Sequence, residues 1–213
     1  MYQTRTIKFK NKIEDAGYLN LLNEVVKKTG GYVSGGCFKD MFYYKTPRDL
    51  DIYFRTKYDL EHAIKVFEDE EYTKAYENEN CIAFAFPYTK DENSITQVFI
   101  LEFVKSKIGN PEDVMDTFDF SINRISYDGT DFLSYFGSYN HLIKKQIKII
   151  NYNNPIGSLQ RVIKYSGYGF KIGNNELVKL LYEIAKQSWL HILNLPAFFD
   201  SQLKKGYRYD YIG

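Results

Sequence analysis

A pair of glycines followed by a pair of aspartates is the feature that most constrains how this chain folds. Residues 35–54 read GGCFKDMFYYKTPRDLDIYF. The pattern predicts a short strand over 32–34 and a helix over about 38–44, so Gly35 and Gly36 lie in the turn between them. Glycine lets a backbone approach a phosphate closely, and the amino end of a helix attracts negative charge. The turn is therefore a candidate phosphate-binding site.

Two aspartates open the strand that is predicted next, over 50–55. Asp49 follows Gly36 by thirteen positions, and Asp51 comes two positions later. Because side chains alternate along a strand, both carboxylates lie on one face. They repel each other unless a cation lies between them, and oxygen ligands of this kind suit Mg²⁺. An isolated Asp-x-Asp favours a solvated turn before a strand, whereas the glycine pair upstream favours a metal site.

The remaining pattern predicts an α+β fold. We expect a helix over 14–28, a helix over 59–69, a hairpin of strands 81–86 and 96–104, and a helix starting at 110–113. A strand over 148–150 and helices over 158–165 and 175–193 follow. We therefore predict a head domain over residues 1–150, with a mixed sheet and flanking helices, and a helical neck and C-terminal region over 151–213.

The distribution of charge separates the same two parts. Residues 1–140 contain 17 Lys and Arg against 23 Asp and Glu, a net charge of −6, whereas residues 141–213 contain 11 against 4, a net charge of +7. An acidic front suits metal-binding carboxylates, and a basic back attracts phosphates. The alternative is an uneven spread of solvated surface charge. We therefore expect the basic C-terminal part to contact a tRNA-like RNA acceptor, or at least the triphosphate tail of a nucleotide.

Composition excludes several classes of protein. With 44% hydrophobic residues among 213, the chain can bury a core. It has no apolar stretch approaching the roughly 18 residues that span a bilayer, and no apolar segment follows its basic first residues. Cys37 and Cys81 match neither a zinc pattern nor a disulfide framework. We expect a cytoplasmic protein with reduced thiols and no membrane partner; the sequence leaves the oligomeric state open.

The glycine and aspartate motif resembles a known family. Gly35, Gly36, Lys39 and Asp40, together with the Asp-x-Asp pair, fit the pattern GG-x-x-[RK]-D followed by D-x-D. This pattern is similar to that of the pol β-like nucleotidyltransferase superfamily, and specifically to the head of class II tRNA CCA-adding enzymes and bacterial poly(A) polymerases.

Two further motifs follow in the order of those enzymes. Residues 118–128 read FDFSINRISYD, which resembles their DFTINALAYD element. Residues 161–165 read RVIKY and are followed by GFKI at 169–172, which is similar to their neck pattern R-x-[IL]-R-F…GF-x-I. Three motifs in the right order carry the resemblance over about residues 31–172.

The resemblance implies a transferase that uses Mg²⁺ or Mn²⁺ and takes a nucleoside monophosphate from a nucleoside triphosphate such as ATP. It implies that Asp49 and Asp51 are the catalytic metal ligands. The implied nucleotide-binding residues are Ser34, Gly35, Gly36, Lys39, Asp119, Asn123 and Arg161. In-line attack of an acceptor, possibly an RNA 3′ end, on the α-phosphate then releases pyrophosphate.

Glu102 is the candidate for a third catalytic, metal-binding carboxylate, because members of this superfamily commonly take one from a neighbouring strand. It stands in the predicted strand 96–104, between the apolar Leu101 and Phe103, which point to the other face. A buried carboxylate needs a cation, which the metal would supply. The alternative is an edge-strand or solvent-facing position.

The chain also departs from the CCA-adding pattern. Thr117 and Phe118 replace a pair of arginines, and Lys39 replaces an arginine, which removes a bidentate fork. The Glu-Asp-x-x-Arg element that selects CTP and ATP is missing, as are the body and tail that grip tRNA. The closest resemblance is to small viral-type nucleotidyltransferase-like proteins. Two alternatives stay open: a non-catalytic relative that binds nucleotide or RNA, and transfer to a protein or small molecule.

Overall fold

The computed structural model describes residues 2–4, 7–91 and 93–186. Its helices are α1 (Ile7–Asp15), α2 (Leu19–Thr29), α3 (Cys37–Phe42), α4 (Lys57–Asp69), α5 (Pro111–Asp116), the 3-10 helix η1 (Ser121–Asn123), α6 (Ser138–Ile143), α7 (Pro155–Ser166) and α8 (Asn174–Lys186). Its strands are β1 (Tyr2–Thr4), β2 (Tyr32–Ser34), β3 (Leu50–Phe54), β4 (Lys74–Glu77), β5 (Cys81–Tyr88), β6 (Gln97–Ile108), β7 (Ile125–Tyr127), β8 (Phe132–Tyr135), β9 (Gln146–Ile147) and β10 (Lys171–Ile172).

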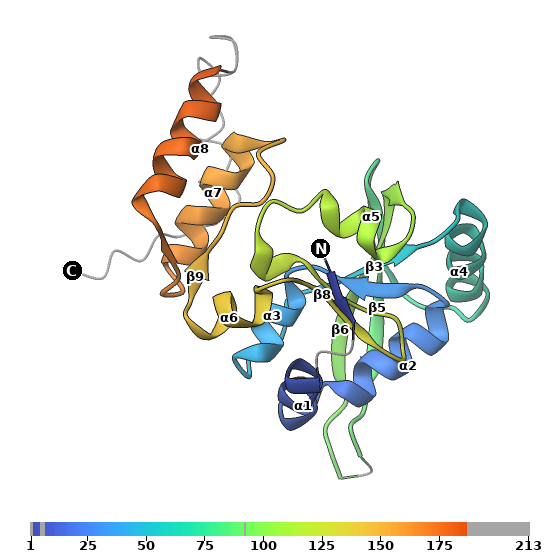
Figure 1. Cartoon of the computed structure of the whole chain (residues 1–213). Helices are drawn as coiled ribbons and strands as arrows, with labels where there is room; N and C mark the ends of the chain where they lie inside the picture. Colours follow the sequence, from blue (N-terminus) through green and yellow to red (C-terminus); the bar gives the residue numbers. More distant parts are fainter. Residues whose placement is uncertain (1, 5–6, 92, 187–213) are drawn as a thin grey trace.

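One large mixed sheet organises the protein, which confirms the α+β fold. Its strand order is β1-β8-β7-β2-β3-β6-β5-β4. The β3–β6 pair is parallel and the other neighbours are antiparallel. In Figure 1 the helices α7 and α8 lie beside each other at the upper left, next to the part that contains the sheet. Of the candidate metal ligands, Asp51 is on β3, Asp49 stands directly before it and Glu102 is on β6, so all three lie near the middle of the sheet.

Aromatic side chains fill much of the core. Phe67 of α4 packs against Phe84 of β5 and Phe103 of β6, with ring centroids 5.2 and 4.9 Å apart. Phe38 of α3 packs against Phe132 of β8, with centroids 5.8 Å apart. Four of these rings are fully buried: Phe38, Phe67, Phe84 and Phe103. Edge and tilted contacts of this kind add to the free energy gained by burying apolar area.

The helix predicted over 14–28 is wrong in its first part. The chain forms two helices, α1 and α2, separated by a turn at Gly17. The φ of Gly17 is +79°, a left-handed conformation that ends a helix and that glycine adopts without a steric penalty. The apolar spacing on both sides is helical, so the pattern alone does not reveal the turn.

Other boundaries also differ from the prediction. The strand expected over 148–150 is replaced by β9, two residues earlier, and by an isolated bridge between Phe120 and Ile149. The region after residue 150 also contains a strand, β10, which pairs in parallel with β9. The helix expected over 175–193 is described as far as Lys186, and its expected continuation lies outside the described residues. The strands β1, β4, β7 and β8 were not expected.

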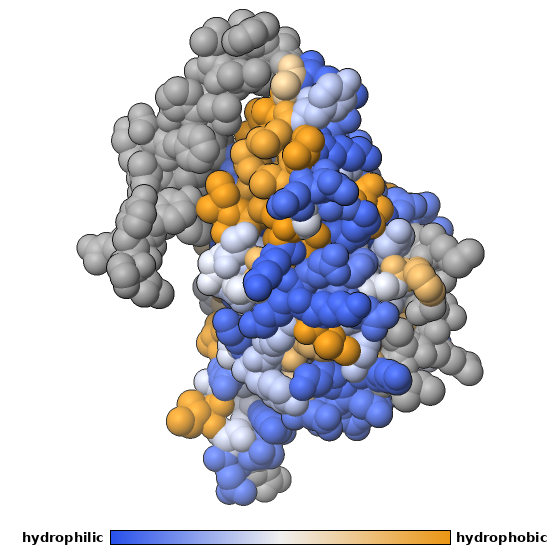
Figure 2. Space-filling view, turned by 60° about the vertical axis from the view of Figure 1, so that its left-hand side comes forward, coloured by the Kyte–Doolittle hydropathy of each residue, from blue (hydrophilic) through white to orange (hydrophobic). Residues whose placement is uncertain are grey.

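The surface differs between the two parts. No helix among the described residues is long and apolar enough to cross a membrane. Figure 2 shows apolar side chains gathered in the upper part of the molecule, above a broad hydrophilic face. On α8 the exposed apolar side chains are Val178, Leu181 and Tyr182.

Candidate functional site

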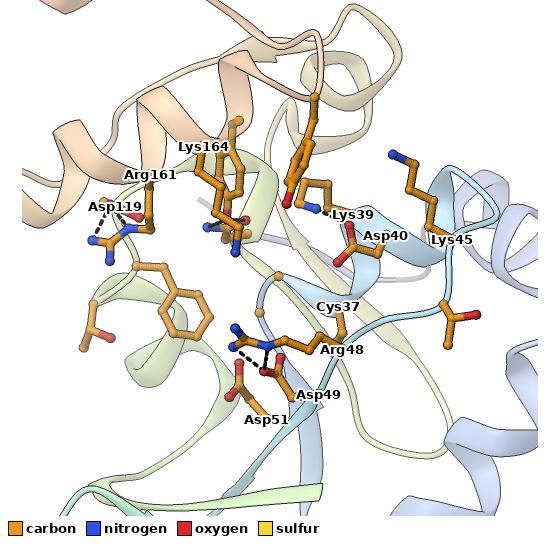
Figure 3. A pocket seen from close by; sticks show the side chains of 18 of the residues that line it. Cys37, Lys39, Asp40, Lys45, Arg48, Asp49, Asp51, Asp119, Arg161 and Lys164 are labelled. Atoms are coloured by element: carbon orange, nitrogen blue, oxygen red, sulfur yellow. Dashed lines mark hydrogen bonds and ion pairs between the residues drawn. The ribbon is translucent and has the colours of Figure 1, made fainter. Parts of the chain in front are cut away.

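A cavity of about 570 Å³ brings together the three sequence motifs. The turn before α3, the start of β3, residues 117–123 and α7 form its walls. In Figure 3, Asp49 and Asp51 lie beside each other, Lys164 extends toward them from α7, and Arg161 of the same helix turns to Asp119. Ligand pockets of roughly 300–1,000 Å³ hold molecules the size of a nucleotide.

Gly35 is required by the geometry of the turn. Its φ is +111°, which other residues adopt only with strain, and a Cβ at this position would lie 3.2 Å from Oδ2 of Asp51. The backbone N–H of Gly35 donates to the carbonyl of Ile125, which fixes the turn to the start of β7. Gly36 is the N-cap of α3. Both glycines line the pocket, as the motif predicts.

Asp49 and Asp51 lie next to each other at the pocket and are both partly buried. Asp49 already has a cationic partner, because Nε and Nη2 of Arg48 lie 2.6 and 2.5 Å from its Oδ2. Three quarters of the Arg48 side chain is exposed to solvent. An exposed pair of this kind contributes little to stability, so it is readily exchanged for another cation.

The surroundings of Asp51 are those of a carboxylate that needs a cation. Burial raises the pKa of Asp51 to about 7, and the neighbouring charges of Glu102 and Asp49 add to the effect, whereas Arg48 and Lys107 oppose it. A divalent ion would relieve the repulsion among these carboxylates. The oxygen donors of Asp49 and Asp51 thus fit Mg²⁺ or Mn²⁺.

The raised pKa of Asp51 makes stability depend on pH. Since the folded, metal-free protein holds this proton more tightly than the unfolded chain does, it loses stability as the pH rises from about 4 to about 7. We expect metal-free Asp51→Asn to gain about 1–3 kcal/mol over wild type at pH 8 and almost nothing at pH 4. Urea unfolding in the presence of a chelator measures this difference. Asp69→Asn, a change at the exposed end of α4, should gain nothing, and parallel pH profiles for wild type and Asp51→Asn would contradict the prediction.

Glu102 lies on the strand next to Asp51 but outside the pocket wall. In the parallel β3–β6 pair, Asp51 and Glu102 are register partners and share a face. The Tyr76 hydroxyl, reaching across the small Ala83 of β5, donates a hydrogen bond to Glu102. Within the described residues, no three His, Cys, Asp or Glu side chains are grouped closely enough to hold a metal ion. Of the three predicted carboxylates, Asp49 and Asp51 therefore line the cavity, and Glu102 acts on Asp51 as a charged neighbour.

Lys39 is held at the edge of the pocket. Its ammonium forms an ion pair with Asp40 and lies 5.3 Å from the ring centroids of both Tyr165 and Tyr168. The residue is only 4% exposed. Its position therefore depends on the aromatic rings from the end of α7.

Asp119 and Asn123 contact α7 directly. Oδ2 of Asp119 accepts hydrogen bonds from Ser158 Oγ at 2.8 Å and from Arg161 Nε at 2.7 Å. The amide of Asn123 lies 3.2 Å from the Tyr165 hydroxyl. These contacts brace α7 against the residue 118–128 motif, and Arg161 thereby faces Asp119 while it lines the pocket.

Ser34 is the one predicted nucleotide-binding residue that the structure places elsewhere. It is fully buried, and its hydroxyl donates to the carbonyl of Ile125 at 3.0 Å. It does not line the cavity. Its side chain helps to join β2 to β7, because a buried hydroxyl needs a partner.

Several cations line the pocket that the motifs did not point to. They are Lys45, Arg48 and Lys107. Burial lowers the pKa of Lys107, and the nearby charge of Arg161 lowers it further. Arg48 stands directly before Asp49, which was the available signal for it, whereas Lys107 comes from β6 and carries no motif. With Arg161 and Lys164 these residues surround the carboxylates with positive charge, an arrangement that suits a polyanionic ligand and a divalent metal together.

Comparison with solved structures places this fold among CCA-adding enzymes. The chain is similar to a CCA-adding enzyme bound to CTP, with a TM-score of 0.62 and 13% identity over 89% of this chain. It is also similar to a CCA-adding enzyme bound to ATP (TM-score 0.61, 15% identity, 90% of this chain) and to the Thermotoga maritima CCA-adding enzyme complexed with tRNA (0.60, 14%, 87%). It spans 48%, 48% and 46% of those chains, about half their length. The nucleotidyltransferase fold that the motifs implied is confirmed.

Comparison of sequences gives a more specific result. A family model described as Gad2, Gabija anti-defense 2 family protein, matches residues 3–145 of this chain. That range contains the glycine turn, the Asp-x-Asp pair and the residue 118–128 motif, and it ends before α7. No curated protein sequence matches the chain significantly.

Proposed function

The chain belongs to the Gabija anti-defense 2 family, and from this membership and the pocket geometry we propose that it acts against Gabija defence as a metal-dependent nucleotidyltransferase. It takes a nucleoside monophosphate from a nucleoside triphosphate and transfers it to an acceptor. The observation that carries the proposal is the pair Asp49 and Asp51 beside the Gly35 turn, in a cavity of nucleotide size.

The carboxylate pair would hold the metal ion, and Mg²⁺ bound by one or two carboxylates in this way commonly takes up substrate phosphates as well. When bound, the ion supplies positive charge to the triphosphate and lowers the pKa of the attacking hydroxyl. The turn at Gly35 and Gly36 allows close approach of the phosphates, and Lys39 adds charge from the edge of the pocket.

In the reaction, the acceptor oxygen forms a bond to the α-phosphorus as the bond from that phosphorus to the bridging oxygen breaks. The hydroxyl proton is released and pyrophosphate leaves. Asp119 positions Arg161 over the pocket, and Asn123 fixes Tyr165 at its wall. These residues hold α7 in place, so that the nucleotide is oriented for in-line attack.

RNA is the acceptor that we test first. A structural neighbour is complexed with tRNA, and Lys45, Lys107 and Lys164 give the pocket a positive rim. Nucleic-acid binding through such lysines falls steeply with salt, because phosphate contacts release counterions. The family description also makes a protein component of Gabija defence a candidate acceptor, which the same experiment examines.

The test is incubation with each α-labelled nucleoside triphosphate and Mg²⁺, together with total RNA or with purified Gabija components, followed by gel analysis. Label in an RNA band identifies an RNA acceptor, and label in a protein band identifies a protein acceptor. Binding to RNA should weaken markedly between about 50 and 200 mM salt if RNA is the acceptor. Absence of label from every band, with bound nucleotide recovered intact, would support a non-catalytic nucleotide-binding protein.

A further inference from the structure

Lys107 lines the pocket from β6, a strand that contains none of the three motifs. It stands near the end of β6, is half-buried, and lines the cavity beside Thr117 and Phe118. Its Nζ donates a hydrogen bond of 2.6 Å to Oγ1 of Thr117 and lies 5.4 Å from the centroid of the Phe118 ring. The Thr117 hydroxyl in turn donates to the carbonyl of Val114 at 2.7 Å. The ammonium is therefore held in one place before any ligand binds.

The charges around Lys107 are not balanced within the protein. In the part of the chain that the structure describes, its ammonium makes no ion pair with a carboxylate, although the charges of Asp51 and Asp119 act on it from a distance. Asp119 is already paired with Arg161 at 2.7 Å. The guanidinium of Arg161 acts on Lys107 as a second positive charge. Two cations that face one cavity repel each other, and an anion bound between them relieves this repulsion.

We propose that Lys107 binds the triphosphate tail of the nucleotide, on the side of the pocket between Asp51 and Arg161. This inference rests on the proposed function and adds a residue that none of the three motifs contains. An ammonium held by Thr117 and Phe118 keeps two protons free for phosphate oxygens. Thr117 and Phe118 themselves stand where the CCA-adding pattern has arginines, so Lys107 brings a positive charge from β6 to a place where this chain lacks one.

The test compares ligands that differ in their phosphates. Binding of ATP, AMP and inorganic tripolyphosphate to the full chain is measured by calorimetry with Mg²⁺, for wild type and for Lys107→Gln. We expect Lys107→Gln to weaken ATP and tripolyphosphate by tenfold or more, roughly the effect of losing one charge-assisted hydrogen bond, and to leave AMP within about twofold. Lys107→Arg keeps the charge, so its affinity for ATP and tripolyphosphate should lie between that of wild type and that of Lys107→Gln.

The matched control is Lys105→Gln. Lys105 is on the same strand two residues earlier, but its ammonium pairs with Glu77 at 3.1 Å, outside the cavity. This variant should bind all three ligands as wild type does. If Lys107→Gln does not fold, as judged by circular dichroism, Lys107→Met keeps the apolar stem and replaces it in the comparison.

The outcomes separate this inference from the proposed function. If wild type transfers nucleotide while Lys107→Gln binds tripolyphosphate normally, the Lys107 assignment alone is wrong. An equal loss for ATP and AMP would also overturn it, because such a loss does not depend on the triphosphate. If wild type binds tripolyphosphate through Lys107 but transfers no nucleotide to any acceptor, the proposed function fails and the phosphate site stands.

Discussion

Asp51→Asn and Asp49→Asn are each expected to slow nucleotide transfer by at least about a hundredfold, with the fold intact. Both carboxylates lie at the pocket, and asparagine keeps their shape while removing the charge that holds the metal. The loss corresponds to roughly 3 kcal/mol or more of transition-state stabilisation. Initial rates of pyrophosphate release, measured with the acceptor found by labelling, give the effect directly.

The control for this prediction is Asp69→Asn, since Asp69 is exposed at the end of α4 and does not line the pocket. Its rate should equal that of wild type. Thermal unfolding of all three variants shows whether they remain folded. Turnover of Asp49→Asn and Asp51→Asn at the wild-type rate would remove the carboxylate pair from the reaction and, with it, the proposed metal site.

The second large effect is expected at the contact between Asp119 and α7. Asp119→Asn should lower the free energy of unfolding by about 1–3 kcal/mol, because it removes a charged acceptor from Arg161 and from the fully buried Ser158. For a chain of this size the melting temperature should fall by roughly 3–9 °C. Scanning calorimetry measures the shift.

A double-mutant cycle shows whether the loss comes from this contact. Asp119→Asn and Arg161→Gln together should cost less than the sum of the two single changes, because either one already breaks the pair. Glu61→Gln provides the comparison, since Glu61 and Lys57 form an exposed pair on α4 at 3.4 Å. That change should cost no more than about 0.5 kcal/mol. Additive effects of the Asp119 and Arg161 changes would mean that their side chains do not stabilise each other.

The parts of the site that were predictable are those determined by local sequence. The turn at Gly35 requires glycine, and the two-residue spacing of Asp49, directly before β3, and Asp51, within it, is enough to bring both to the pocket. Both features depend on neighbours within about twenty residues. The same holds for most helices and for the β5–β6 hairpin, whose apolar patterns are regular.

The parts that were not predictable depend on contacts between distant segments. The β3–β6 pairing shifts register, since Ile52 pairs with Phe103 but Phe54 pairs with Ile108. Simple alternation along β6 would give Lys105 and Lys107 the same surroundings, yet only the second lines the pocket. The partner of Glu102 was equally hidden, because Tyr76 belongs to β4, whose residues are all exposed and show no strand pattern.

The order of the pocket residues along the chain also determines when the pocket is completed as the protein is synthesised. A ribosome releases the chain from its amino end, so Asp49 and Asp51 emerge well before Lys107, and Arg161 and Lys164 of α7 come later still. A nascent chain that stops short of α7 therefore carries the carboxylate pair with Lys45, Arg48 and Lys107, but without Arg161 and Lys164. The full set of cations around the carboxylates is therefore assembled only when α7 docks, and we expect the proposed nucleotide site to be incomplete before that step.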